Sequence, residues 1–156
     1  MQTLHARAAL TPAGWAEEVR ISIAEGRIAA MTEGPADGLR SVDLLLPAPV
    51  NLHSHAFQRA MSGLTETRGP DPGDTFWTWR RLMYRFLDRL TPEDVEAIAA
   101  LVYMEMLEAG YAGVAEFHYL HHDAGGRAHA SPAEMAERIL AAAAATGIGL
   151  TLLPVL

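Results

Sequence analysis

The sequence from Pro49 to Gln58 is PVNLHSHAFQ, which places a His-x-His pair directly after an apolar run. The run, Val42 to Leu52, predicts a buried strand that two prolines divide. Because side chains alternate between the two faces of a strand, we expect His53 and His55 to point the same way at its C-terminal end. Two imidazoles on one face can bind one divalent metal ion, and neutral imidazole suits zinc. The position of the pair after a strand favours a metal site over a chance occurrence among seven histidines.

The composition narrows the class of protein. The 156 residues are half apolar and 20% charged, which suits one ordinary domain with a sizeable core. A net charge of −7 without any Lys/Arg-rich block argues against a nucleic-acid binder. The sequence has no cysteine, so any zinc must be held by His, Asp or Glu. It also has no signal-peptide pattern and no apolar run long enough to span a bilayer, so we expect a cytoplasmic protein that does not bind membranes.

Residues 2–34 predict short strands. The first candidate is Leu4 to Leu10. Glu18 to Ala24 alternates apolar and polar residues and pairs with Arg27 to Thr32 across Glu25-Gly26, a hairpin turn in which glycine supplies a positive φ. Because two or three short strands are marginal alone, we expect this segment to belong to a sheet that other parts of the chain complete.

The chain after residue 46 alternates strands and helices. Helices are predicted from Thr75 to Leu90 and from an N-cap at Thr91 to about Gly110. A third helix is predicted from a capping box at Ser131-Pro132-Ala133-Glu134 to Gly147. Strands are predicted at Ala112–Phe117 and Ile148–Leu156. This order predicts a parallel sheet with right-handed crossovers. Most residues of the apolar and aromatic stripe of the first helix are predicted to pack in the core. The long connection Arg68–Asp74 is predicted to be a lid or substrate loop.

Three motifs together resemble one known family. They are NLHSHAFQRAM at 51–61, FWTWR at 76–80 followed by Met83-Tyr84, and EFHY at 116–119 followed by HHD at 121–123. The chain resembles the formimidoylglutamate deiminases of the amidohydrolase superfamily over essentially its whole length. His-x-His alone is shared by many superfamily members, whereas the other two motifs are much more specific.

The resemblance implies a fold and a domain division. The fold class would be α/β, namely the N-terminal part of a (β/α)8 TIM-type barrel of a metal-dependent hydrolase, preceded by a small β-sandwich segment. Residues 1–45 would form the incomplete β-sandwich segment. Residues 46–156 would form the first three β/α units of the barrel.

The resemblance also implies a reaction and its residues. The reaction would be zinc-dependent hydrolysis of N-formimino-L-glutamate to N-formyl-L-glutamate and ammonia, in histidine degradation, by a homodimer. His53 and His55 match the first two zinc ligands. Gln58, Arg80 and Tyr119 match substrate-binding positions, with Arg80 expected to pair with a substrate carboxylate and Arg81 held in reserve. No role is assigned to His118, His121 or His122.

Two departures from the family pattern matter. The superfamily commonly has Pro-Gly before the metal strand, whereas this sequence has Pro47-Ala48-Pro49. A (β/α)8 barrel needs roughly 250 residues, so the remaining zinc ligands and the catalytic acid/base groups would lie beyond Leu156. We therefore expect the chain to be the N-terminal part of a longer enzyme, and to be poorly stable and inactive alone.

Three alternatives stay open. The first is another deaminase of the superfamily that acts on guanine, cytosine or a triazine, for which Trp77 or Trp79 would stack on the ring. The second is a complete, non-catalytic domain that binds a partner chain or weakly binds a metal. The third is a second polypeptide that supplies the missing strands.

Overall fold

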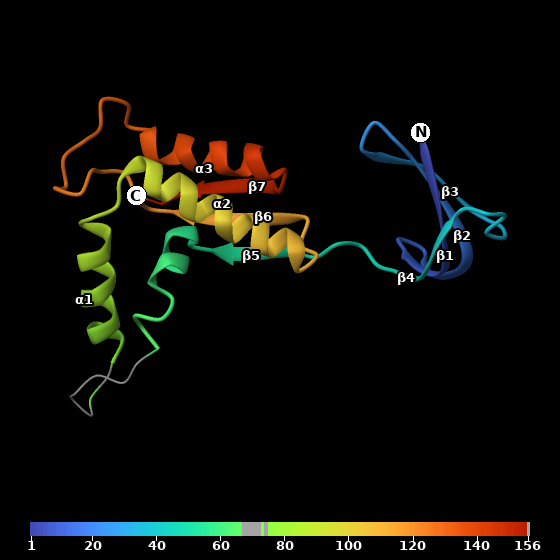
Figure 1. Cartoon of the computed structure of the whole chain (residues 1–156), viewed down its shortest axis with the longest axis horizontal. Helices are drawn as coiled ribbons and strands as arrows, with labels where there is room; N and C mark the ends of the chain where they lie inside the picture. Colours follow the sequence, from blue (N-terminus) through green and yellow to red (C-terminus); the bar gives the residue numbers. More distant parts are fainter. Residues whose placement is uncertain (67–72, 74, 156) are drawn as a thin grey trace. The chain divides into compact units, whose positions relative to one another are not determined.

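The chain divides into two compact units, Met1–Ala48 and Pro49–Leu156, each with its own buried apolar cluster. We describe residues 1–66, 73 and 75–155 from a computed structural model, shown in chain order in Figure 1. The division falls three residues after the predicted boundary at 45/46. Apart from Gly73, the segment predicted to be a lid, Arg68–Asp74, lies outside the described residues.

The first unit is a four-stranded sheet in the order β3-β2-β1-β4. Its strands are β1 (Gln2–Thr11), β2 (Gly14–Ala24), β3 (Arg27–Glu33) and β4 (Arg40–Leu45). The pairs β1–β2 and β2–β3 are antiparallel, and β1–β4 is parallel. The predicted hairpin is confirmed: Glu25 and Gly26 have φ values of 51° and 72°, the positive pair that a tight two-residue turn requires.

The run from Val42 to Leu52 is not one buried strand. The first part of the run belongs to β4 in the first unit, and its last part belongs to β5 (Val50–Ser54) in the second. The two prolines lie between these strands, as predicted. The expectation of burial is wrong, because the exposed fractions of Leu44, Val50 and Leu52 are 53%, 52% and 76%. β5 is an edge strand that pairs with β6 on one side and has no second neighbouring strand in the described part of the chain.

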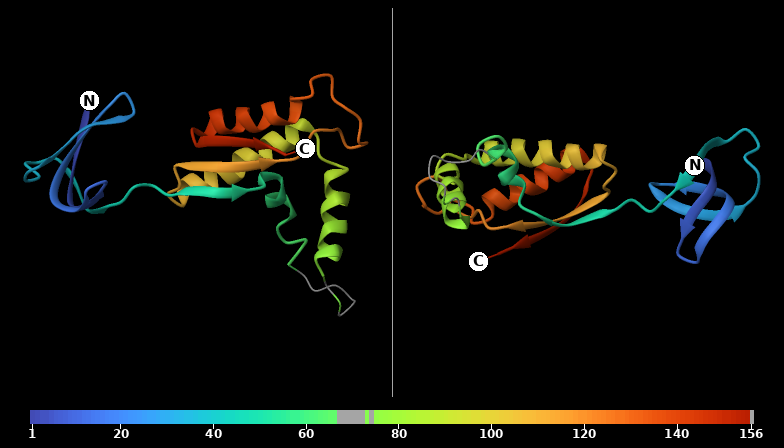
Figure 2. Two further views of the ribbon diagram at one scale, coloured as in Figure 1. Left: turned by 180° about the vertical axis from the view of Figure 1, so that it is seen from behind. Right: turned by 90° about the horizontal axis from the view of Figure 1, so that it is seen from below.

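The second unit is a parallel sheet in the order β5-β6-β7, with β6 at Gly113–His118 and β7 at Gly149–Pro154. A short 3-10 helix, η1 (Ala56–Met61), follows β5, and α1 (Phe76–Leu87) and α2 (Pro92–Glu108) lead to β6. Helix α3 (Glu134–Thr146) leads to β7. The predicted alternation of strands and helices is confirmed. Helices α2 and α3 lie side by side along one face of the sheet (Figures 1 and 2).

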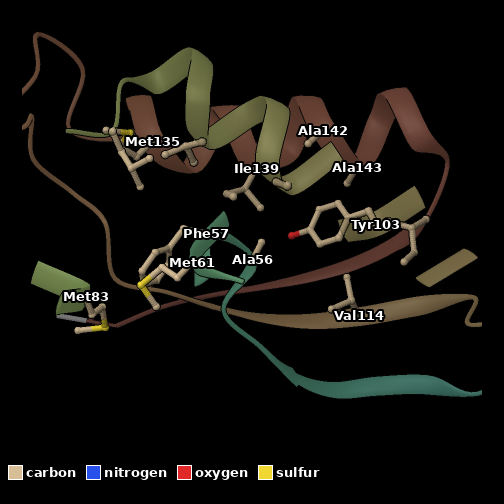
Figure 3. Close-up of a cluster of buried hydrophobic side chains, with 14 residues drawn as sticks. Ala56, Phe57, Met61, Met83, Tyr103, Val114, Met135, Ile139, Ala142 and Ala143 are labelled. Carbon is tan, nitrogen blue, oxygen red and sulfur yellow. The ribbon is translucent and has the colours of Figure 1, made fainter. Parts of the chain in front are cut away.

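The core of this unit fills the space between the sheet and helices α2 and α3 (Figure 3). Val114 of β6, Tyr103 of α2 and Ile139 of α3 are almost completely buried there. The prediction that most residues of the apolar and aromatic stripe of α1 pack in the core is confirmed. Trp79, Phe86 and Leu87 pack against the cluster, but Phe76 and Trp77 are mostly exposed at the start of the helix.

The helix ends follow local sequence signals with one exception. Thr91 caps α2, and its hydroxyl accepts from the backbone N–H of Asp94. Gly147 ends α3 with a φ of 82°. The capping box predicted at Ser131 does not form, because α3 begins at Glu134 and the Glu134 carboxylate pairs with Arg138 at 2.7 Å. In the described residues, no helix is both long and apolar enough to cross a membrane.

Candidate metal and substrate site

Strand β5 carries a one-residue bulge just before the histidine pair. Asn51 pairs with Val114 and Ser54 pairs with Glu116, so three steps along β5 match two along β6. The Asn51 side-chain oxygen accepts from the backbone N–H of His53 at 3.0 Å, and thereby satisfies a donor in the interrupted stretch of the ladder.

The bulge sets the face on which the histidines lie. Asn51 faces the helices, because its Nδ2 lies 3.8 Å from the Met106 sulfur of α2. Simple alternation from Asn51 would send His53 and His55 to the same helix-covered side. The extra residue turns both rings to the opposite face, where they contact the ring of Phe117. The histidines do share a face, but plain alternation along an unbroken strand is not the reason.

The two imidazoles lie close together with geometry that fits one metal ion. Their ring centroids are 4.8 Å apart and their planes are nearly perpendicular. Two imidazoles on one tetrahedral zinc, with Zn–N bonds of about 2.0–2.1 Å, have centroids roughly 5 Å apart. His55 Nδ1 lies 2.9 Å from the carbonyl oxygen of Phe117, and a carbonyl can only accept. The hydrogen bond therefore assigns the proton to Nδ1 and leaves the Nε2 lone pair for a metal.

The described residues supply two imidazole ligands, His53 and His55, at the end of β5. Within residues 1–66, 73 and 75–155, no group of three or more His, Asp or Glu side chains is arranged to hold a metal ion. A catalytic zinc site normally has three protein ligands or more. His53 and His55 thus form a partial donor set.

Gln58 and Tyr119, two of the predicted substrate-binding residues, meet beside the histidines. Gln58 on η1 donates from Nε2 to the Tyr119 hydroxyl at 3.1 Å. The Tyr119 ring packs edge-on against His55, with centroids 4.9 Å apart, and against Phe57. Partial burial raises the pKa of the Tyr119 hydroxyl, so this group remains a proton donor at neutral pH.

Arg80 lies on α1 and contacts other partners. Its guanidinium donates to the Tyr84 hydroxyl at 2.9 Å and lies over the rings of Trp77 and Tyr84. Tyr84 and Tyr119 both line a cavity of about 250 Å³. Arg81 is exposed.

The three further histidines take different places around this cavity. His118 is buried, and burial together with the nearby His121 lowers its pKa to about 4. The His121 ring nitrogen Nε2 lies 2.7 Å from the carbonyl oxygen of Val155, and His121 and His122 both line the cavity. Because its pKa is lowered, His118 stays neutral at physiological pH.

Sequence reasoning missed Glu116. This residue is 2% exposed, and its carboxylate accepts from the backbone N–H of Ala56 at 2.6 Å. Burial raises the pKa of the carboxyl group, and the hydrogen bonds from the Ala56 N–H and the Ser54 hydroxyl oppose that rise. The available signal was an acidic residue in the apolar stretch Gly113–Phe117, where a lone carboxyl group needs a specific partner.

Comparison with known proteins places the chain in a family. Residues 44–154 match the family model described as "Amidohydrolase family". The chain belongs to the amidohydrolase family. Residues 1–38 of this amidohydrolase match a second model, described as "Formimidoylglutamate deiminase HutF, N-terminal domain".

The relatives of this amidohydrolase are longer proteins. A curated formimidoylglutamate deiminase from Pseudomonas aeruginosa is 56% identical over the whole chain, which spans 35% of that protein. An 8-oxoguanine deaminase from the same organism is 32% identical over 77 residues, which is 49% of this chain and 16% of that protein. The chain thus spans about a third of the length of its most similar relative described here.

Solved structures share the fold. An amidohydrolase from Brucella melitensis is 50% identical with a TM-score of 0.89, and the match covers 97% of this chain and 34% of that one. Atrazine chlorohydrolase TrzN from Arthrobacter aurescens TC1, complexed with zinc, has a TM-score of 0.77 at 19% identity, covering 99% of this chain and 35% of that one. The second match shows the fold alone.

Proposed function

We propose that this chain is part of a zinc-dependent deiminase that hydrolyses N-formimino-L-glutamate to N-formyl-L-glutamate and ammonia. The observation that carries the proposal is the meeting of His53 and His55 with the Gln58–Tyr119 pair at the C-terminal ends of β5 and β6. Ligands bind at this end of the strands in α/β barrels. The 56% identity to a protein named formimidoylglutamate deiminase supports the choice of substrate.

The proposal includes the architecture of the longer protein. Residues 46–156 would be the first three β/α units of a (β/α)8 barrel, and residues 1–45 would be part of a β-sandwich. The parallel order β5-β6-β7, with helices between the strands, supports the first assignment. The antiparallel β3-β2-β1 strands with β4 alongside support the second.

The residues described would share the chemistry as follows. His53 and His55 would hold the zinc ion, and the ion would supply an activated water molecule as the nucleophile. Water adds to the formimino carbon, the carbon–nitrogen bond to the terminal nitrogen breaks, and that nitrogen leaves as ammonia after protonation by a general acid. Gln58 and Tyr119 would hydrogen-bond the formimino end and orient its carbon.

Arg80 would bind a carboxylate of the substrate. N-formimino-L-glutamate carries two carboxylates, and a guanidinium can grip one of them through two parallel hydrogen bonds. The contacts of Arg80 with Trp77 and Tyr84 leave its charge without a carboxylate partner among the described residues. A substrate carboxylate would meet this cation next to the cavity that Tyr84 and Tyr119 line.

The cellular setting is proposed on the same basis. The enzyme would act in histidine degradation in the cytoplasm, as a homodimer, with neither nucleic acid nor membrane as partner. The net charge of −7 supports the absence of a nucleic-acid partner.

The test is ammonia release from N-formimino-L-glutamate by the protein made at the length of its Pseudomonas aeruginosa relative, with guanine as the competing substrate. We expect turnover of N-formimino-L-glutamate that a zinc chelator abolishes and added zinc restores. Release of ammonia from guanine alone would contradict the proposal.

A ring deaminase is the second candidate. The 32% identity to an 8-oxoguanine deaminase over 77 residues favours it, as does Trp77, whose ring is mostly exposed and could stack on a flat substrate. The same ammonia assay separates the two, since a ring deaminase would leave N-formimino-L-glutamate intact.

A further inference from the structure

Glu116 is an acidic side chain buried on the helix-covered face of β6. It lies two residues after Val114 on that face, whereas Phe117 points to the opposite face, toward His53 and His55. In Figure 3 the hydroxyl of Tyr103 on α2 points toward Ala56 at the start of η1. The backbone N–H of Ala56 donates to the Glu116 carboxylate. Burial of a carboxyl group among apolar side chains is costly, so this residue needs a compensating role.

The Glu116 carboxylate binds the chain where it leaves β5. Its Oε1 accepts the Ala56 backbone N–H at 2.6 Å, a short bond of the charge-assisted kind. Ala56 is the first residue of η1, so its N–H has no partner within that helix. The Ser54 hydroxyl lies on the other side of His55 and interacts with the same carboxylate.

His55 is therefore held from two consecutive residues of β6. Phe117 accepts from the ring through its carbonyl oxygen, at 2.9 Å from Nδ1, and fixes the rotation of the imidazole. Glu116 contacts the residues on both sides of the histidine, through the backbone N–H of Ala56 and the side-chain hydroxyl of Ser54. The first contact orients the ring, and the second fixes the backbone from which the ring projects.

We propose that Glu116 is a positioning residue that holds the Ser54–Ala56 backbone and thereby keeps His55 aimed at the metal ion. This inference rests on the metal site of the proposed function and assigns no contact between Glu116 and metal or substrate. Without the carboxylate, the Ala56 N–H would be buried without a partner, and the turn would shift to find one. A displacement of the ring by a fraction of an ångström weakens a metal–nitrogen bond, because the ligand geometry is narrow.

The experiment compares zinc affinity in three variants of the protein made at the length of its Pseudomonas aeruginosa relative. Glu116→Met fills the same space without an acceptor, and Glu116→Gln keeps an acceptor oxygen for Ala56. We expect chelator competition to show zinc bound about tenfold to a hundredfold more weakly by Glu116→Met, and within about threefold of the parent by Glu116→Gln. Ile139→Val, a matched change in the same core, should lower stability without weakening zinc binding.

Two further measurements separate positioning from general destabilisation. In NMR spectra of the metal-free proteins, the Ala56 amide proton should lose its protection from exchange in Glu116→Met and keep it in Glu116→Gln. If Glu116→Met does not fold, Glu116→Asp serves instead, since its shorter side chain withdraws the acceptor from Ala56 while keeping the charge.

The outcomes distinguish this inference from the proposed function. The role of Glu116 is overturned if the parent and Glu116→Met bind zinc equally well. Where Glu116→Asp replaces the Met variant, equal zinc affinity in parent and Glu116→Asp overturns it. Equal weakening in Glu116→Gln and Glu116→Met also overturns it, because the amide retains the acceptor. If the parent binds zinc but does not hydrolyse N-formimino-L-glutamate, the proposed substrate fails while a selective loss in Glu116→Met still supports positioning. A parent that binds no zinc overturns both.

Discussion

Tyr119 makes contacts through its ring and through its hydroxyl group. Its ring packs against His55 and Phe57. Its hydroxyl accepts from Gln58 and donates to the Met83 sulfur. Tyr119→Phe keeps the ring and removes only the hydroxyl. In the proposed enzyme we expect KM for N-formimino-L-glutamate to rise about fivefold, because a lost hydrogen bond to substrate is worth about 1 kcal/mol. Steady-state kinetics measures the change.

Tyr84→Phe provides a matched control on α1. It removes the hydroxyl that accepts from Arg80, but the aromatic face beneath the guanidinium remains. Tyr119→Phe and Tyr84→Phe should both have thermal stabilities close to that of the parent. An unchanged KM in Tyr119→Phe would show that its hydroxyl does not contact the substrate.

His118 gives a prediction about pH. Its pKa is about 4 in the folded chain, against 6.5 for an ordinary histidine, because burial and His121 disfavour the charged ring. Between pH 6.5 and 4 the unfolded chain therefore binds a proton that the folded chain does not. The free energy of unfolding should fall as pH decreases through this window, and above pH 6.5 this residue should contribute no pH dependence.

The contribution of His118 is isolated by a difference measurement. His118→Gln keeps a polar side chain that does not titrate, so the decline in its unfolding free energy between pH 6.5 and 4 should be shallower than that of the parent. Urea unfolding at several pH values in this range measures both slopes. Parallel slopes in the two proteins would contradict the assignment.

At the scale of a single element, the bulge in β5 is the feature that places the histidines. Asn51 supports it, since its oxygen binds the His53 N–H and its amide group contacts Met106. Asn51→Ala removes the acceptor of this solvent-exposed hydrogen bond and should cost about 0.5–1.5 kcal/mol, the usual net contribution of one hydrogen bond. Chemical denaturation measures that loss. Zinc affinity should fall as well, because a strand without the bulge would turn His53 and His55 toward the helices.

Asn51→Asp is the matched control for the bulge. It retains an oxygen that can accept from His53 and changes only the group that faces Met106. We expect it to bind zinc more tightly than Asn51→Ala does. The importance of the Asn51–His53 hydrogen bond is contradicted if the alanine and aspartate variants bind zinc equally well.

Local signals predicted those elements that local chemistry controls. The Glu25-Gly26 turn and the Thr91 cap depend on a few adjacent residues, and both form as expected. The capping box at Ser131 does not form: the Ser131 hydroxyl accepts from the Ala133 N–H, and the Glu134 carboxylate accepts from Arg138, which also reaches Glu96 on α2.

The site was predictable in its residue types but only partly in its arrangement. The His-x-His pair after an apolar strand was a direct signal. The bulge that sets its face depends on pairing between β5 and β6, which are separated by more than fifty residues. Glu116 was missed for the same reason, since its partner Ala56 is 60 positions away. The contacts of Arg80 with Trp77 and Tyr84, by contrast, follow helical spacings of three and four residues.

At the scale of the whole molecule, the candidate site lies entirely within one compact unit. His53, His55, Gln58, Arg80 and Tyr119 all belong to Pro49–Leu156, whose core is separate from that of Met1–Ala48. The two histidines project from an edge strand of a three-stranded sheet. In a closed barrel such a strand would have a second neighbour, and further ligands would approach from strands on the far side.

This arrangement predicts how zinc affinity depends on chain length. The 156-residue chain provides two imidazoles but, among its described residues, no third donor near them. We expect it to bind zinc at least about a hundredfold more weakly than the protein made at the length of its Pseudomonas aeruginosa relative, because a catalytic zinc site normally uses three or more protein ligands. Chelator competition on both proteins measures the ratio, and His53→Ala and His55→Ala should each weaken both. Tight one-to-one zinc binding by the 156-residue chain, lost in both variants, would mean that this chain completes a metal site by itself. That result would favour a metal-binding domain over one part of a larger active site.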